Sequence, residues 1–174
     1  MNLREIQAPL KQSYRDEPGR ASITLQASGS QQETPMSCSV DIGRAVYEAQ
    51  AHAGVGGAGT AACSGDLLLG ALAACAQITC QMVAAASGIA VNGIAVEVEG
   101  DLDLRGTLGI SREAPVGFEA IRVRFDVDAP EATAEQLDRL KALTERYCVV
   151  MQTLTSPPPV ETQWSGSQAS QKGA

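Results

Sequence analysis

The chain has 174 residues, of which 44% are hydrophobic, 19% charged and only 3% aromatic, and its formal net charge is -7. The apolar fraction excludes a disordered chain, and the length favours one domain with tails. Acidic charge and scarce aromatic rings argue against nucleic-acid binding, which needs basic patches and stacking side chains. The polar N-terminal segment resembles neither a signal peptide nor a lipidation motif, so we expect a cytoplasmic protein whose five cysteines are reduced.

The first part of the chain is predicted to form a β-hairpin followed by a flexible loop. Apolar and polar residues alternate over 23–27 and again over 36–42, with the polar turn sequence GSQQET between them. The segment at 43–50 is expected to begin helically. The glycines of 52–63 then indicate a loop that lies close to the next element.

The longest apolar stretch runs from Ser64 to Ser87 and predicts a helix that is apolar on nearly all sides. At ~1.5 Å per residue it is long enough to cross a bilayer. It is rich in alanine, contains Asp66 in its first turn, and has no positive flanks. We therefore interpret it as a central helix that a soluble protein must cover on all sides. Ser64 is a suitable N-cap, and Gly88 is expected to end the helix.

Two long alternating runs follow, over 94–105 and 121–128. Acidic residues occupy the polar positions of the first run, and the second carries Arg122 and Arg124. This pattern predicts antiparallel neighbours whose opposite charges pair across the solvated face. Gly100 is expected to mark a bulge or bend in the first strand.

A second helix is predicted from the capping-box residues Thr133 and Gln136. Its apolar face continues in phase as far as Cys148. Residues 160–164, VETQW, are expected to add a final strand. Strands and helices that are segregated along the chain predict the α+β class with antiparallel sheet.

The cysteines do not form a metal-binding pattern, because there is no CxxC and His52 is the only histidine. Cys38 lies on the apolar side of a predicted strand and is expected to pack as a small hydrophobe. Cys63 adjoins the N-terminus of the long helix, where the dipole makes it a rival nucleophile. Cys75 and Cys80 are ~140° apart around that helix and cannot pair with each other. From the residues alone, Cys75 could either pack in the core or act as a reactive thiol.

Four segments of the chain resemble the OsmC/Ohr family. They are SGDLLLGALAACAQIT, VEVEGDLDLRGTLG, PVGFEAIRVRF and LTERYCVV, and the resemblance extends over about residues 20–160. It implies curved antiparallel sheets around two central helices in an intertwined homodimer. The chain then divides into an N-terminal lead-in at 1–20, one OsmC-like domain at 21–164 and a flexible tail at 165–174.

The same resemblance implies a peroxiredoxin-like enzyme that reduces organic hydroperoxides. Cys75 matches the peroxidatic cysteine of the family, and Cys148 matches the resolving one. Cys38, Cys63 and Cys80 match no catalytic position. The family implies no bound cofactor and no metal, and an external dithiol such as a lipoyl protein is the expected reductant.

The group that would stabilise the Cys75 thiolate is left open. The glutamate that efficient peroxidases of the family carry ten residues before this cysteine is replaced by Gly65, and the acid Asp66 follows it. The candidates are therefore four residues: His52, Asp66, Arg44 and Arg20. Two other functions remain as alternatives, a non-catalytic small-molecule binder and a thiol redox sensor.

Overall fold

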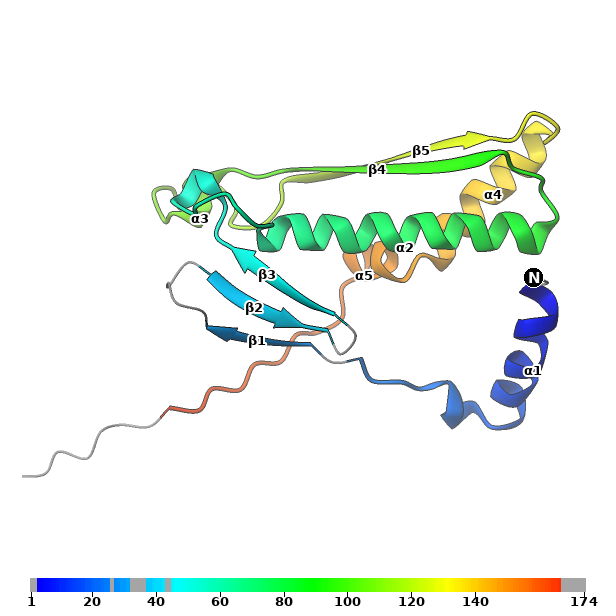
Figure 1. The fold of residues 1–174 in the computed structure, drawn as a ribbon, viewed down its shortest axis with the longest axis horizontal. Coiled ribbons are helices and arrows are strands. Elements are labelled where there is room, and N and C mark those ends of the chain that lie inside the picture. Colours follow the sequence, from blue (N-terminus) through cyan, green and yellow to red (C-terminus); the bar gives the residue numbers. More distant parts are fainter. Residues whose placement is uncertain (1–2, 26, 32–36, 43–44, 167–174) are drawn as a thin grey trace, which may run out of the picture.

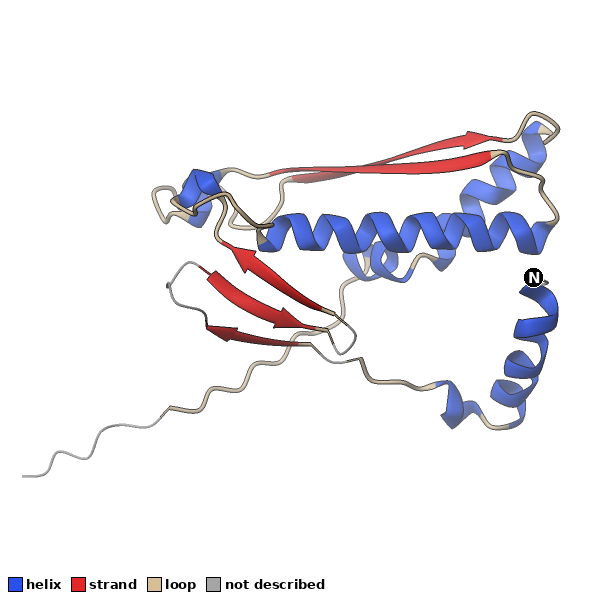
Figure 2. Ribbon diagram, in the orientation of Figure 1, coloured by secondary structure: helices blue, strands red, loops and turns tan. Residues whose placement is uncertain are grey.

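The computed structural model describes residues 3–25, 27–31, 37–42 and 45–166 and shows helices combined with antiparallel strands (Figures 1 and 2). The strands form a three-stranded sheet in the order β1-β2-β3 and a two-stranded sheet of β4 and β5. The strands are Ser28–Gln31 (β1), Ser37–Asp41 (β2), Val46–Gln50 (β3), Gly93–Asp101 (β4) and Ala120–Asp128 (β5). The helices are Leu3–Asp16 (α1), Ser64–Ser87 (α2), Leu104–Thr107 (α3), Ala134–Tyr147 (α4) and Val149–Thr155 (α5), with 3-10 turns at Pro18–Ala21 (η1) and Ala53–Val55 (η2). The predicted α+β class is confirmed.

Helix α2 has the predicted bounds, but its N-cap is Cys63 and not Ser64. The Cys63 Sγ accepts the backbone N–H of Asp66 at 3.5 Å, and the Asp66 Oδ2 accepts the N–H of Cys63 at 2.9 Å. Gly88 ends the helix in the left-handed conformation, with φ of 72°. Helix α2 is long and apolar enough to cross a membrane, but the core helix of a soluble protein meets the same two criteria. It packs against β4, α4 and α5 (Figure 1).

The N-terminal third differs most from the sequence-based expectations. The predicted lead-in contains α1, and the described residues of 23–27 belong to no strand. The segment expected to start helically instead contains β3, which pairs antiparallel with β2. Val46 and Tyr47 favour strands, and pairing with a neighbouring strand supplies the hydrogen bonds that the local sequence could not reveal. The predicted turn sequence GSQQET covers residues 29–34, but 29–31 belong to β1, and 32–34 lie outside the described residues.

Strands β4 and β5 are antiparallel neighbours with the predicted charge pairing. Glu97 lies opposite Arg124 at 3.2 Å, and Glu99 lies opposite Arg122 at 3.3 Å. Gly100 forms no bulge, because it pairs regularly with Ile121. A Cβ at Gly100 would come within 2.5 Å of the Phe118 ring, so the close approach of this ring explains the glycine.

Two apolar clusters lie along the length of α2. One gathers around the buried residues Cys80, Val83, Ala84, Ile89 and Leu140, and the other around Leu72, Ala76 and Cys148. The inward faces of β4 and β5 cover both. Other apolar side chains of α2 remain in solvent, including Ile78 at 55% and Met82 at 40% exposed. A single chain therefore does not cover this helix on all sides.

After α5 the chain leaves the body as an extended arm (Figure 1). The expected strand at 160–164 is absent from this described segment, and Val160 and Trp164 are 86% and 94% exposed. The prolines that precede it cannot donate to a sheet, and both described sheets consist of β1–β5 alone.

Candidate active site

Cys75 lies midway along α2 and is half-buried. It packs against the cluster that contains Cys148, and one turn further along α2 the Thr79 Oγ1 lies 4.0 Å from its Sγ. The structure therefore brings together the two cysteines that the resemblance singled out, and it places a hydroxyl beside one of them.

Cys148 lies between two helices and not within one. Helix α4 ends at Tyr147, Cys148 adopts an extended conformation with φ of -72° and ψ of 104°, and α5 begins at Val149. The Gln152 side chain spans the break by donating to the Glu145 carbonyl at 2.9 Å. Cys148 is 0% exposed. The expected burial is confirmed, but the expectation that helix continues through this residue was wrong.

The helix break places backbone N–H groups beside Cys75. Burial alone would raise the pKa of the Cys75 thiol, because it disfavours the thiolate. Hydrogen bonds from the Val150 N–H, the Cys148 thiol, the Thr79 hydroxyl and the Val149 N–H outweigh that effect. The pKa of Cys75 therefore lies below its ordinary value.

The pKa of Cys148 moves in the opposite direction. Burial raises it, and the hydrogen bond and negative charge of Cys75 raise it further, against partial opposition from the Met151 and Val150 N–H groups. Cys75 therefore loses its proton first, while Cys148 stays a thiol and donates to it. A nucleophilic thiolate next to a protonated thiol can be oxidised and then cross-linked.

The other cysteines lie elsewhere. Cys63 caps α2, and Cys80 is buried in the other apolar cluster. Burial raises the pKa of the Cys80 thiol, and the Thr144 hydroxyl opposes this only in part. Cys38 lies on β2, and its side chain is outside the described part of the structure. Among the described residues, no group of three or more His, Cys, Asp or Glu side chains could hold a metal ion.

None of the described candidates for activation contacts Cys75 within the chain. The His52 Nδ1 accepts the Gly54 N–H at 3.0 Å, and Asp66 is engaged in the α2 cap. Asp66 precedes Cys75 by nine residues, or about 14 Å along the helix. Arg20 lies in η1, where it is 3.5 Å from Glu17. Arg44 is outside the described residues, so the activating role of these four residues stays a prediction.

Apart from Cys148, the groups that do reach Cys75 were missed by the sequence analysis. The N–H groups of Val149 and Val150 became available only because helix α4 stops one residue before Cys148. The consecutive β-branched residues after Cys148 are a weak signal for such a break, since their stiff side chains lower helix propensity. Thr79 could have been found from its spacing of one helical turn from Cys75.

Replacing Val149 with proline is expected to raise the pKa of Cys75, because it removes one of the N–H donors. Proline is favoured at the first residue of a helix, and Cys148 already has the extended backbone that precedes a proline. The pKa is measured from the pH dependence of Cys75 alkylation, which should slow at neutral pH. Val149→Ala keeps the N–H and should leave the midpoint unchanged. An unshifted midpoint in Val149→Pro would contradict this prediction.

The fold and the site together define an α+β protein with antiparallel sheets and a pair of contacting cysteines. One of these cysteines lies on a central helix and the other at a helix break. A family model described as OsmC-like protein matches residues 57–163, more than half of the chain. The chain belongs to the OsmC-like protein family. No curated protein matches its sequence significantly.

Solved structures show the same fold at low sequence identity. An OsmC like protein from Mycoplasma pneumoniae has a TM-score of 0.65 and 15% identity, covering 78% of this chain and 90% of that chain. An organic hydroperoxide resistance protein from Elizabethkingia anophelis has a TM-score of 0.61 and 17% identity, covering 78% of this chain and 91% of that chain. The organic hydroperoxide resistance protein OsmC from Legionella pneumophila has a TM-score of 0.59 and 16% identity, covering 77% of this chain and 90% of that chain.

Proposed function

We propose that this protein is a thiol-dependent peroxidase that reduces organic hydroperoxides. The observation that carries the proposal is the contact between a thiol of lowered pKa, Cys75, and a buried thiol of raised pKa, Cys148. Two of the structurally similar proteins are named organic hydroperoxide resistance proteins, which supports the same reaction class.

In the proposed reaction, the Cys75 thiolate attacks one oxygen of the hydroperoxide and breaks the O–O bond. The alkoxide takes up a proton and leaves as the alcohol, and Cys75 becomes a sulfenic acid. The Cys148 sulfur then attacks the Cys75 sulfur, and water leaves as the disulfide forms. An external dithiol reduces the disulfide to the two thiols and is itself oxidised to a disulfide.

The surroundings of Cys75 support an organic substrate. Leu72, Ala76 and Val150 all belong to the cluster that packs against it, so an alkyl or aryl group would be drawn from water. No bound cofactor is needed for the proposed steps, and a lipoyl protein would supply the dithiol. We also propose that the protein acts in the cytoplasm, where such reductants keep thiols reduced.

A redox sensor is a second candidate because of one feature of the site. None of the groups that lower the pKa of Cys75 is a lysine or an arginine of the described residues. Neutral donors stabilise a thiolate less strongly than a charged partner does. This environment would fit a thiol pair that reacts more slowly with peroxide, is oxidised once, and is then recognised in its oxidised form by another protein.

A steady-state assay separates these functions. Peroxide consumption is followed with cumene hydroperoxide or hydrogen peroxide, in the presence of dihydrolipoamide. Many turnovers, faster with cumene hydroperoxide, are expected for the peroxidase. A single stoichiometric oxidation would instead indicate the sensor, and no reaction with either peroxide would contradict both.

The proposed enzyme is a homodimer. A second subunit would cover the apolar side chains of α2 that one chain leaves in solvent, such as Ile78 and Met82. Light scattering at micromolar concentration is expected to give twice the chain mass of 18.1 kDa. A mass equal to one chain would contradict this prediction.

A further inference from the structure

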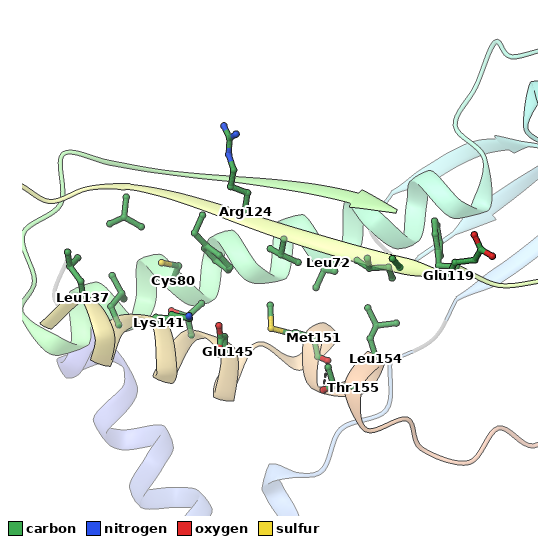
Figure 3. A pocket seen from close by; sticks show the side chains of 18 residues that line it. Leu72, Cys80, Glu119, Arg124, Leu137, Lys141, Glu145, Met151, Leu154 and Thr155 are labelled. Carbon is green, nitrogen blue, oxygen red and sulfur yellow. Dashed lines mark hydrogen bonds between the residues drawn. The ribbon is translucent and has the colours of Figure 1, made fainter. Parts of the chain in front are cut away.

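The break between α4 and α5 changes the hydrogen-bond partner of one backbone carbonyl, that of Glu145. In a continuous helix this carbonyl would accept the N–H of Val149, four residues further along. The extended backbone of Cys148 turns Val149 away from α4, and the Val149 N–H hydrogen-bonds to the Cys75 sulfur instead. Figure 3 shows Glu145 near the end of α4 and Met151 on α5, on either side of the break. The Glu145 carbonyl can therefore accept another donor.

The side-chain amide of Gln152 is that donor. Its Nε2 donates to the Glu145 carbonyl oxygen at 2.9 Å. The backbone N–H of Gln152 donates to the Cys148 carbonyl at 2.9 Å, which closes the first turn of α5. The N–H of Cys148 donates to the Thr144 carbonyl at 3.0 Å, which closes the last turn of α4. Gln152 thus joins the end of one helix to the start of the next.

Two arrangements of this segment compete for the same backbone N–H groups. In a continuous helix the Glu145 carbonyl would take the N–H of Val149, and the N–H of Val150 would likewise turn to the carbonyl four residues before it. Neither N–H would then reach Cys75. In the broken arrangement both stay free of α4, and Gln152 satisfies the Glu145 carbonyl. A hydrogen bond that exists only in the broken arrangement stabilises it relative to the continuous one.

We propose that Gln152 is a positioning residue whose side chain stabilises the helix break and so keeps the N–H groups of Val149 and Val150 on the Cys75 sulfur. Gln152 is not among the groups that hydrogen-bond to Cys75, so it acts through the backbone. Among the described residues that act on Cys75, Cys148 is the only titratable one. The role rests on the proposed peroxidase function, in which Cys75 attacks as a thiolate, but the thiolate can be measured without peroxide.

Gln152→Met tests this role, because methionine has nearly the same length and helix propensity as glutamine but no donor. Gln152 is exposed, so the variant is expected to fold, and circular dichroism checks this. The pKa of Cys75 is measured from the pH dependence of its alkylation by iodoacetamide, with peptide mapping to separate Cys75 from the other cysteines. We expect the midpoint to rise by about half a pH unit, within the usual net value of one hydrogen bond.

Thr155→Val is the matched control. The Thr155 hydroxyl donates to the carbonyls of Met151 and Gln152 at 3.0 and 3.3 Å, within α5 and not across the break (Figure 3). Its removal takes a side-chain hydrogen bond from α5 without releasing the Glu145 carbonyl. The alkylation midpoint of Cys75 should therefore stay unchanged.

The Val149→Pro background gives a second test. Proline has no N–H that the Glu145 carbonyl could take, and it keeps the preceding residue, Cys148, extended. Because the break is then fixed by the proline, Gln152→Met should shift the midpoint no further. The proposal is overturned if Gln152→Met alone leaves the midpoint unchanged, if Thr155→Val shifts it equally, or if the full shift persists beside Val149→Pro. A protein that shows the expected shifts but turns over no peroxide would contradict the proposed peroxidase and not the role of Gln152.

Discussion

Treatment with one equivalent of cumene hydroperoxide is expected to join Cys75 to Cys148 in an intrasubunit disulfide. Replacing Cys75 with Ser should abolish turnover and the rapid oxidation of Cys148, because the remaining thiol is buried and its pKa is raised. Replacing Cys148 with Ser should leave Cys75 as a sulfenic acid that excess peroxide converts to sulfinic acid. Peptide mapping by mass spectrometry identifies each product.

Cys63→Ser is the matched control for these variants. Serine is a preferred N-cap and can accept the Asp66 N–H as Cys63 now does, so this change should preserve both fold and turnover. A dominant crosslink between Cys63 and Cys75, or between Cys75 and Cys80, would show that the assignment is wrong. Rapid oxidation that survives in Cys75→Ser would show the same.

Leu72→Ala is expected to lower the free energy of unfolding by about 3 kcal/mol, because it removes buried methyl groups and leaves a void. Leu72 is 2% exposed and belongs to the same apolar cluster as Ala76 and Cys148. The measurement is urea unfolding followed by circular dichroism.

Leu72→Met is the control for this change because it nearly conserves side-chain volume and should cost less than about 1.5 kcal/mol. Equal losses of unfolding free energy in the two variants would mean that packing around Leu72 does not stabilise the fold.

The sequence predicted those elements whose signals are local. Helix α2 has an uninterrupted apolar composition and a terminal glycine, and the β4–β5 hairpin has strict alternation with opposite charges in register. The capping box of Thr133 and Gln136 likewise marked the start of α4. In each case the residues that decide the structure lie close together in the sequence or in one repeating pattern.

The parts that the sequence did not predict depend on distant partners. The segment of β3 was expected to begin helically, but it forms a strand that pairs with β2. Cys148 keeps the apolar phase of α4, so its pattern could not show that the helix stops at Tyr147. The resemblance identified both cysteines, but the backbone donors at Val149 and Val150 follow from that stop and needed the structure.

The burial of Cys148 has a consequence for how an oxidised pair would be recycled. In a Cys75–Cys148 disulfide, Cys75 is the better leaving group because its thiolate is the more stable, so a reductant should attack the Cys148 sulfur. That sulfur is fully enclosed in the reduced protein, at the N-terminus of a helix of only seven residues. None of the residues of α5 is fully buried, and an element with few buried contacts opens locally at low free-energy cost. The rate of recycling should then level off at high dithiol concentration, at the rate at which α5 opens.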